Sequence, residues 1–257
     1  MVGGSMRITI LGSGTSTGVP EIGCTCPVCM SKDSRDDRMR CSALIETREE
    51  RILIDCGPDF RRQMLGIPYA PIHAVLLTHE HYDHVGGIDD LRPFCRQGDV
   101  PLYAEQEVAA HIRHRIPYCF AAQKYPGVPR VTMNEIEAFR SFRIGNTEIL
   151  PIQVMHGKLP ILGYRIGRMA YITDMLTMPT ESYDVLQGVD CLIMNALRIE
   201  PHNTHQSLEQ ALENRSRIAP KECYFIHMSH GLGLHSHVEA TLPSHVHLAY
   251  DGLQIEI

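Results

Sequence analysis

Short apolar runs separated by polar turns make up most of this chain, and their length is that of β-strands. The polar segment Thr47–Glu50 joins two such runs and predicts a hairpin. Further runs fall between Val131 and Ile166, and a turn and strand close the chain at Tyr250–Ile257. The remaining predicted strands are Arg7–Leu11, Ala43–Glu46, Arg51–Asp55, Ala74–Leu77, Met169–Thr173 and Cys223–Ile226.

Helical patterns alternate with these strands. Ser207–Arg217 places Leu208, Ala211 and Leu212 on one face, as an amphipathic helix does. The other predicted helices are Pro58–Leu65, a segment from Asp83 through Ile88, and Glu105–Arg115. Tyr118–Pro129, rich in Pro, Gly and aromatic residues, is predicted to be a loop near the pocket. Strands followed by helices, twice over, predict an α/β (α+β) fold in which two sheets pack face to face with helices outside.

The segment from Thr78 to His84, which reads Thr-His-Glu-His-Tyr-Asp-His, carries the strongest chemical signal. It follows the predicted strand Ala74–Leu77 directly. The period of a strand points His79 and His81 the same way, and a helix starting next would bring in Asp83 and His84 on its first turn. Imidazole and carboxylate donors converging in this way suit a pair of zinc, manganese or iron ions.

This motif resembles that of the metallo-β-lactamase superfamily, whose members read Thr-His-x-His-x-Asp-His. The resemblance implies an αββα sandwich of two mixed sheets, with the ligand loops along one edge. It also implies a later His, a later Asp and a last His, each at a strand end. The chain supplies these three at His156, Asp174 and His227, each after an apolar run.

An aspartate ends the predicted strand Arg51–Asp55 and precedes Cys56-Gly57. The superfamily often has Asp-x-Gly at this place, and the resemblance implies that Asp55 supports the metal ligands by hydrogen bonding. An ordinary strand-ending Asp is the alternative interpretation.

Three of the nine cysteines, Cys24, Cys26 and Cys29, lie within six residues of one another. An odd number of cysteines without a secretory leader argues against a disulfide framework. Three thiolates in one short loop suit a structural zinc site, and buried or redox-active thiols are the alternative. The other cysteines are predicted to be core residues, namely Cys41, Cys56, Cys95, Cys119, Cys191 and Cys223.

The cysteine loop, the Gly-rich turn after the first strand and the segment His227-Met228-Ser229-His230 together are similar to the PhnP-like cyclic phosphodiesterase family. The likeness runs from about Arg7 to Ile257. It implies that His230 completes the zinc site with the three cysteines. It also implies that His205 serves as an acid or a phosphate clamp. The alternative for His205 is a helix-start residue without a chemical role.

Composition excludes several function classes. The chain has 257 residues, a net charge of −6 and no basic block, so we expect no binding to membranes or to polymeric nucleic acid. We find no 18-residue apolar span and no leader, and therefore expect a cytoplasmic protein. Met1–Ser5 resembles a vector leader, which leaves residues 6–257 as one hydrolase domain. A homodimer is left open.

The resemblance implies two divalent ions, zinc or manganese, with iron or nickel as alternatives, and one structural zinc. His79, His81 and His156 would hold one active-site ion, Asp83, His84 and His227 the other, and Asp174 would bridge them. Such a pair lowers the pKa of a shared water. We therefore expect a metal-dependent phosphodiesterase in which a bridging hydroxide cleaves a small, for example cyclic, phosphodiester, with Asp83 and His205 as catalytic residues. A thioester or lactone hydrolase and a non-catalytic carrier are the alternatives.

Overall fold

The apolar runs of the chain form two seven-stranded sheets in the computed structural model, which describes residues 5–257. All of the predicted leader Met1–Ser5 except Ser5 lies outside the described residues. The first sheet has the order β14 (Gln254–Glu256), β1 (Arg7–Gly12), β2 (Ser42–Glu46), β3 (Arg51–Ile54), β4 (Ala74–Leu76), β5 (Val100–Ala104) and β6 (Val131–Glu135). The second has the order β13 (Val246–Leu248), β12 (Glu222–Ile226), β11 (Cys191–Asn195), β10 (Met169–Ile172), β9 (Leu159–Ile166), β8 (Thr147–His156) and β7 (Phe142–Ile144).

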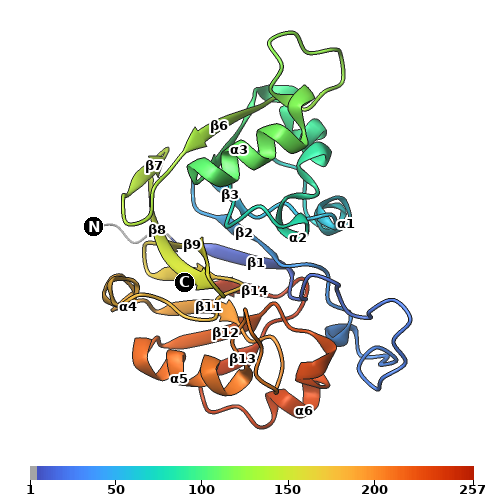
Figure 1. Cartoon of the computed structure of the whole chain (residues 1–257), viewed down its shortest axis with the longest axis vertical. Helices are drawn as coiled ribbons and strands as arrows, with labels where there is room; N and C mark the ends of the chain where they lie inside the picture. Colours follow the sequence, from blue (N-terminus) through green and yellow to red (C-terminus); the bar gives the residue numbers. More distant parts are fainter. Residues whose placement is uncertain (1–4) are drawn as a thin grey trace.

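Helices cover the outer face of each sheet, so the molecule is the predicted αββα sandwich (Figure 1). The α-helices are α1 (Phe60–Leu65), α2 (Tyr82–Val85), α3 (Gln106–Arg115), α4 (Thr180–Leu186), α5 (Leu208–Ile218) and α6 (His235–Glu239). The 3₁₀ helices are η1 (Ser34–Asp36), η2 (Ile88–Gln97), η3 (Pro117–Cys119) and η4 (His230–Leu232). Figure 1 shows α1 and α3 with the first sheet, and α5 and α6 with the second.

The side chains of each strand point alternately to the two faces of its sheet, and this alternation creates the layers of the fold. In β4, Val75 packs outward in the cluster under α1 and α3, whereas Ala74 and Leu76 join the cluster between the sheets. The cysteines predicted to be core residues are all buried, and within residues 5–257 none of the nine cysteines forms a disulfide. Each sheet is mixed, because β3–β6 and β10–β13 run parallel while the strands beside them pair antiparallel.

The predicted helix from Asp83 through Ile88 is wrong in its length. α2 ends at Val85, and the chain restarts as η2 at Ile88. Gly87 donates its backbone N–H to Cys56 O at 2.8 Å instead of continuing the helix. A Cβ atom at Gly87 would lie 2.0 Å from Gly57 O, so only glycine permits this close approach.

The segment Tyr118–Pro129 is mostly loop, as expected. Tyr118 donates a hydrogen bond to Asp89 of η2 at 3.0 Å. Figure 1 shows the green loop projecting beyond α3 at one end of the long axis. That the loop lies near the pocket stays a prediction.

Among the described residues, no helix combines the length and apolarity needed to cross a membrane.

Candidate metal centre

The predicted ligands gather where strands of both sheets end. β3 leads into Asp55, β4 into the segment from Thr78 to His81, β10 into Asp174 and β12 into His227. His156 is the last residue of β8. β3 and β4 run parallel in one sheet, and β10 and β12 run parallel to β11 in the other, so their carboxyl ends meet at shared edges. Side chains distant in sequence therefore reach one site.

Three of these residues adopt a left-handed backbone conformation that side-chain-bearing residues rarely use. Asp55, Asp174 and His227 have φ values of 60°, 55° and 54°. Such strain is held only where surrounding contacts over-determine it, and it concentrates at functional sites. Here each turn follows the end of a strand and carries its side chain into the cluster.

Asp174 lies at the middle of the donor atoms. Its carboxylate is 3.3 Å from His84 Nε2 and 3.2 Å from His227 Nε2. Together with Asp83, these residues form a buried group whose donor atoms all lie within 4.8 Å of one another. Asp174 also belongs to a second such group, with His156 and His205.

His79 and His81 lie beside these two groups. His79 Nε2 is 2.9 Å from His81 Nδ1 and 3.9 Å from Asp174 Oδ2. The ring centroids of His81 and His156 are 5.2 Å apart. The structure thus brings together every predicted active-site ligand, and His205 stands among them.

The donor set fits divalent cations. Asp55, Asp83 and Asp174 are buried, yet within residues 5–257 the only cationic side chains that form ion pairs with them are histidines. The buried Nε2 atoms of His84 and His227 lie 3.1–3.7 Å from the Asp83 and Asp174 carboxylates but form no well-aligned hydrogen bond with them. Buried carboxylates and imidazole nitrogens without well-aligned hydrogen bonds are costly unless a cation completes them.

Mutual electrostatics set the charges of this cluster. Burial opposes protonation of His84, but Asp174, Asp55 and Asp83 outweigh it and raise its pKa well above the ordinary value. Burial likewise opposes ionisation of Asp174, but His227 and His84 outweigh it and hold its pKa well below the usual range. For His79 burial dominates and lowers the pKa. The carboxylates of Asp83 and Asp174 are therefore ionised and ready to bind cations.

Asp55 supports the ligands as the resemblance implied. Its Oδ2 lies 2.7 Å from His84 Nδ1 and accepts a hydrogen bond from Thr78 Oγ1 at 2.9 Å, while Oδ1 accepts from the Thr78 backbone N–H. The contact to Nδ1 of His84 leaves Nε2 facing the cluster. Burial raises the pKa of Asp55 despite these contacts.

Asn195 was missed by the sequence analysis. It is buried at the end of β11, where Oδ1 accepts from Met175 N at 2.8 Å and Nδ2 donates to Met175 O at 2.9 Å. These two bonds fix the residue after Asp174 and so hold its left-handed turn. The sequence does hold a signal for it, because Asn195 is a polar residue at the end of the apolar run Cys191–Asn195. The sequence analysis did not predict that run as a strand.

His205 enters the site from the loop before α5. Its Nε2 lies 3.1 Å from Asp174 Oδ2, and its Nδ1 lies 3.2 Å from His202 Nδ1. Burial lowers the pKa of His205 to about 4. Ser207, two residues on, caps α5 in a capping box with Gln210. His202, from the same loop, therefore contacts a site residue.

The cysteine loop forms a second donor cluster with His230. Its Nδ1 is 3.1 Å from Cys24 Sγ, 3.5 Å from Cys26 Sγ and 3.3 Å from Cys29 Sγ. Tetrahedral zinc, with Zn–S of about 2.3 Å and Zn–N of about 2.0 Å, places sulfur and nitrogen roughly 3.6 Å apart. A hydrogen bond from the backbone of Cys29 lowers the pKa of Cys26 to about 6, which favours the thiolate. The four side chains fit a zinc ion.

A buried ion pair between Asp36 and Arg38 lies in the segment after this loop, and Arg38 joins it to the segment that carries both His227 and His230. Arg38 donates to Ser229 O at 3.1 Å, to Gly233 O at 2.9 Å and to Asp36 at 2.9 Å. Sequence analysis missed this network, because Arg38 stands in a polar stretch typical of exposed loops.

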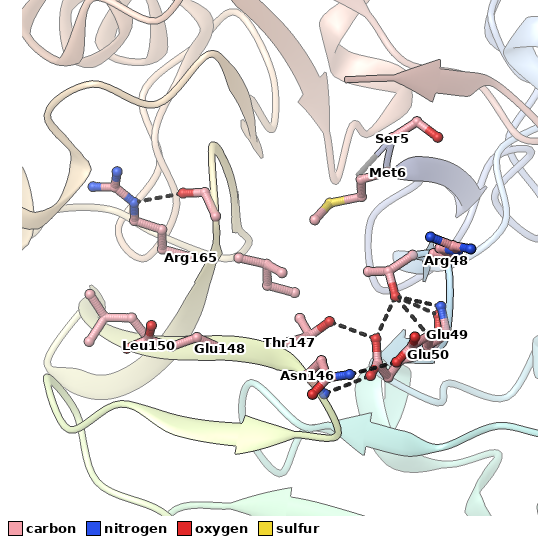
Figure 2. Close-up of a pocket in the computed structure, with 13 residues that line it drawn as sticks. Ser5, Met6, Arg48, Glu49, Glu50, Asn146, Thr147, Glu148, Leu150 and Arg165 are labelled. Carbon is pink, nitrogen blue, oxygen red and sulfur yellow. Dashed lines mark hydrogen bonds between the residues drawn. The ribbon is translucent and has the colours of Figure 1, made fainter. Parts of the chain in front are cut away.

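A cavity of about 710 Å³ lies at the opposite end of β3 from the metal centre. Figure 2 shows its walls, which come from the chain before β1, the turns before β3 and β8, and strands β8 and β9. The Glu50 carboxylate there accepts from Thr47 Oγ1, Asn146 N and Thr147 Oγ1 at 2.6–2.8 Å. This acid is satisfied by the turns that it joins, so the cavity offers no comparable chemistry.

Comparisons with known proteins agree with this geometry. A solved diphosphatase of the PhnP family superposes with a TM-score of 0.92 at 37% identity, covering 98% of this chain and 97% of that one. Zinc-bound PqqB from Methylobacterium extorquens shares the fold, with a TM-score of 0.81 at 22% identity over 98% of this chain and all of that one.

A curated octanoyltransferase from Porphyromonas gingivalis is 47% identical over 251 residues, which are 97% of this chain and 51% of the relative. This chain thus spans about half the length of that relative. The family model of the beta-lactamase superfamily domain matches residues 50–228 of this chain. The chain therefore belongs to the beta-lactamase superfamily and has the metallo-β-lactamase fold.

Proposed function

We propose that this protein is a binuclear metal-dependent hydrolase that cleaves a P–O bond in a small phosphodiester. The observation that carries the proposal is Asp174, whose carboxylate belongs to two groups of donors at once. One carboxylate shared between two sets of ligands suits two neighbouring cations, zinc or manganese. The solved PhnP-family relative is a diphosphatase, which supports chemistry at phosphorus.

The predicted ligands would hold the cations in two sets. His79, His81 and His156 would serve one, Asp83, His84 and His227 the other, and Asp174 both. When bound, a metal pair supplies an activated water nucleophile and neutralises charge that develops on phosphate oxygens. The protein contributes the fixed turns at Asp174 and His227, which hold the ligand atoms in place before substrate arrives.

His205 is proposed to act on the leaving oxygen. With a pKa of about 4 its ring is neutral at pH 7 and can first accept or donate a hydrogen bond. An anionic phosphate close to the ring would raise its pKa and favour the protonated form, which then protonates the leaving alkoxide.

Hydrolysis of a thioester is the second candidate. The octanoyltransferase relative favours it, since acyl transfer is the activity which that protein's name states. The same ligands can serve attack on a carbonyl, because ligands fix the nucleophile while the pocket fixes the bond.

A zinc ion at Cys24, Cys26, Cys29 and His230 is proposed to be structural. Four protein donors would close its coordination and leave no position for substrate.

The first experiment measures hydrolysis of bis-p-nitrophenyl phosphate by chelated protein that is then reloaded with manganese or zinc. We expect turnover that depends on the metal and drops by about 10⁴-fold in Asp83→Ala, a loss typical for a central catalytic carboxylate. Octanoyl-coenzyme A serves as the thioester probe in the same assay. Turnover of the thioester alone would replace the phosphodiesterase proposal with the second candidate, and turnover of neither would favour a carrier.

A further inference from the structure

A pocket of about 530 Å³ opens between α1 and η2, among the elements that cover the outer face of the first sheet. Its lining is mostly apolar and includes three aromatic rings, those of Phe60, Tyr69 and Phe94. A concave, largely apolar surface of this volume is typical of small-molecule sites. None of the predicted metal ligands is among the residues that line it, so it is a candidate site separate from the metal centre.

The aromatic wall of this pocket is built around Phe94. Its ring stacks on Tyr69 with ring centroids 5.4 Å apart, and it meets the Phe60 ring edge-on at 5.8 Å. The Tyr69 hydroxyl donates to Pro93 O at 2.9 Å, which ties the Tyr69 ring to η2. Leu65 and Tyr69 nevertheless remain 71% and 54% exposed. The structure thus holds the rings in place beside exposed apolar surface, which an aromatic ligand would cover.

Arg61 gives the α1 wall of the pocket a positive charge. Its side chain lines the pocket, and within residues 5–257 no acidic side chain forms an ion pair with it. Arg92 on η2 also lines the pocket, but it pairs with Asp89, and Asp90 gives that wall a carboxylate. A guanidinium suits planar or tetrahedral oxyanions. The charges therefore favour a ligand whose anionic group meets Arg61 and whose apolar body lies on the rings.

Both walls of the pocket lead directly from the metal centre. α1 follows the segment that begins with Asp55, and η2 follows α2, which carries Asp83 and His84. The two segments are joined where the walls begin, because Cys56 N donates to His84 O at 2.7 Å and Gly87 N donates to Cys56 O at 2.8 Å. A ligand held between α1 and η2 would therefore restrain both segments.

We propose that the pocket between α1 and η2 is a regulatory site that binds a small aromatic anion. The bound ligand contacts α1 and η2 and holds the segments of Asp55 and His84 in the arrangement that binds metal. The proposal depends on the metal centre, but not on which bond that centre cleaves. It therefore stands or falls separately from the phosphodiesterase function.

The first test is binding of 8-anilinonaphthalene-1-sulfonate to the metal-loaded protein, followed by fluorescence. N-phenyl-1-naphthylamine, which has the same rings without the sulfonate, reports the apolar contacts alone. Arg61→Gln should weaken binding of the sulfonate about threefold, the size of an exposed charged contact, and leave binding of the uncharged compound unchanged. Leu65→Asp should weaken binding of the sulfonate at least tenfold, because it places a carboxylate in the apolar wall. Its Tm should stay close to that of wild type, because Leu65 is mostly exposed.

Arg62→Gln is the matched control, because Arg62 is an exposed arginine of the same helix that does not line the pocket. It should leave binding of both compounds unchanged. Equal weakening by Arg61→Gln and Arg62→Gln would show attraction to surface charge in general and would overturn the site. Undiminished binding in Leu65→Asp would place the probe elsewhere and overturn it as well.

The second test asks whether the pocket is coupled to the metal centre. With the sulfonate at saturation, the chelator concentration that removes half of the active-site metal should rise about fivefold, the lower end of typical coupling, because the ligand segments are already restrained. Leu65→Asp should abolish this rise, and retention of zinc at the cysteine cluster should not change with the probe. An unchanged chelator concentration for wild-type protein with bound probe would overturn the regulatory role.

Discussion

The metal centre and the cysteine cluster are joined by the short segment from His227 to His230, yet they are built differently. The donors of the metal centre come from strand ends far apart in sequence, and most of them are buried. Three of the four donors of the cysteine cluster come from one loop, and the His230 side chain remains 31% exposed. One cluster is therefore assembled by the whole fold, whereas the other is largely local.

The chemistry differs in the same way. Carboxylates and imidazoles of the metal centre suit hard or borderline cations and a reacting phosphate, whereas thiolates suit a closed zinc site. The difference teaches that donors from distant parts of the sequence are brought together where the geometry of a reaction matters. A local loop suffices where a cation only has to hold the chain.

The largest change within this comparison is expected for His205→Ala. The variant should lower kcat by about 10²–10⁴-fold, the range for a positioned acid or base, while both clusters keep their metal. His202→Ala, in the same loop, should lower it much less, because His202 contacts the His205 ring and none of the predicted ligands in the described hydrogen bonds. Steady-state kinetics with bis-p-nitrophenyl phosphate measure both. An unchanged kcat in His205→Ala would leave the residue without a chemical role.

Asp55→Asn should separate the two clusters by metal affinity. The amide cannot accept from both Thr78 and His84 as the carboxylate does, so the active site should bind metal about 10–100-fold more weakly. Zinc at the cysteine cluster should be retained. Competition with a chelator, followed by metal analysis, gives both affinities. Equal losses at both clusters would show that Asp55 supports the fold as a whole.

Cys26→Ser should have the opposite effect, with loss of zinc from the cysteine cluster and retention of the active-site metal. Loss of one thiolate should remove about one zinc per chain and lower Tm by at least about 5 °C, the shift that roughly 2 kcal/mol produces in a chain of this size. Activity per remaining active-site metal should change little. Cys95→Ser is a control, because this thiol is buried in the core and lies outside the cluster. A Cys26→Ser protein with wild-type zinc content and Tm would indicate free thiols in the loop.

The last prediction concerns pH and Asp251, which supports the strand end beside His227. It accepts from Ser13 N, Ser13 Oγ and Met39 N at 2.7–2.8 Å, and Ser13 O in turn accepts from Met228 N. Burial raises the pKa of Asp251 from 3.8 to about 6. The folded protein therefore holds this proton more tightly than the unfolded chain, and raising the pH from about 4 to about 6 lowers stability by up to about 3 kcal/mol.

Urea unfolding of wild type and Asp251→Asn across this pH range tests the assignment. The stability of wild type relative to the variant should fall as the pH rises, because the amide of the variant does not titrate. A difference that is constant with pH would mean that the pKa of Asp251 is the same in the folded and the unfolded chain.

Sequence predicted the active-site ligands because their residue types and order form a dense motif and because each follows an apolar run. Strand and helix periodicity predicted two sheets with helices outside, whereas the αββα sandwich and the roles of His205 and His230 came from the family resemblance. Sequence could not predict that α2 stops at Val85, because this depends on the contact between Gly87 and Gly57, residues that meet only in the folded chain. Nor could it place Asn195 or Arg38, whose roles come from backbone groups of distant segments.

The spacing between His227 and His230 also constrains how this chain can vary in length. An insertion or deletion between them would shift one histidine away from its cluster, because strand β12 anchors one end and Arg38 binds Ser229 and Gly233 at the other. The loop after η3, which projects beyond α3, faces no such constraint (Figure 1). Relatives of different length should therefore differ there, and fusion tags or sensor domains are best inserted at that loop.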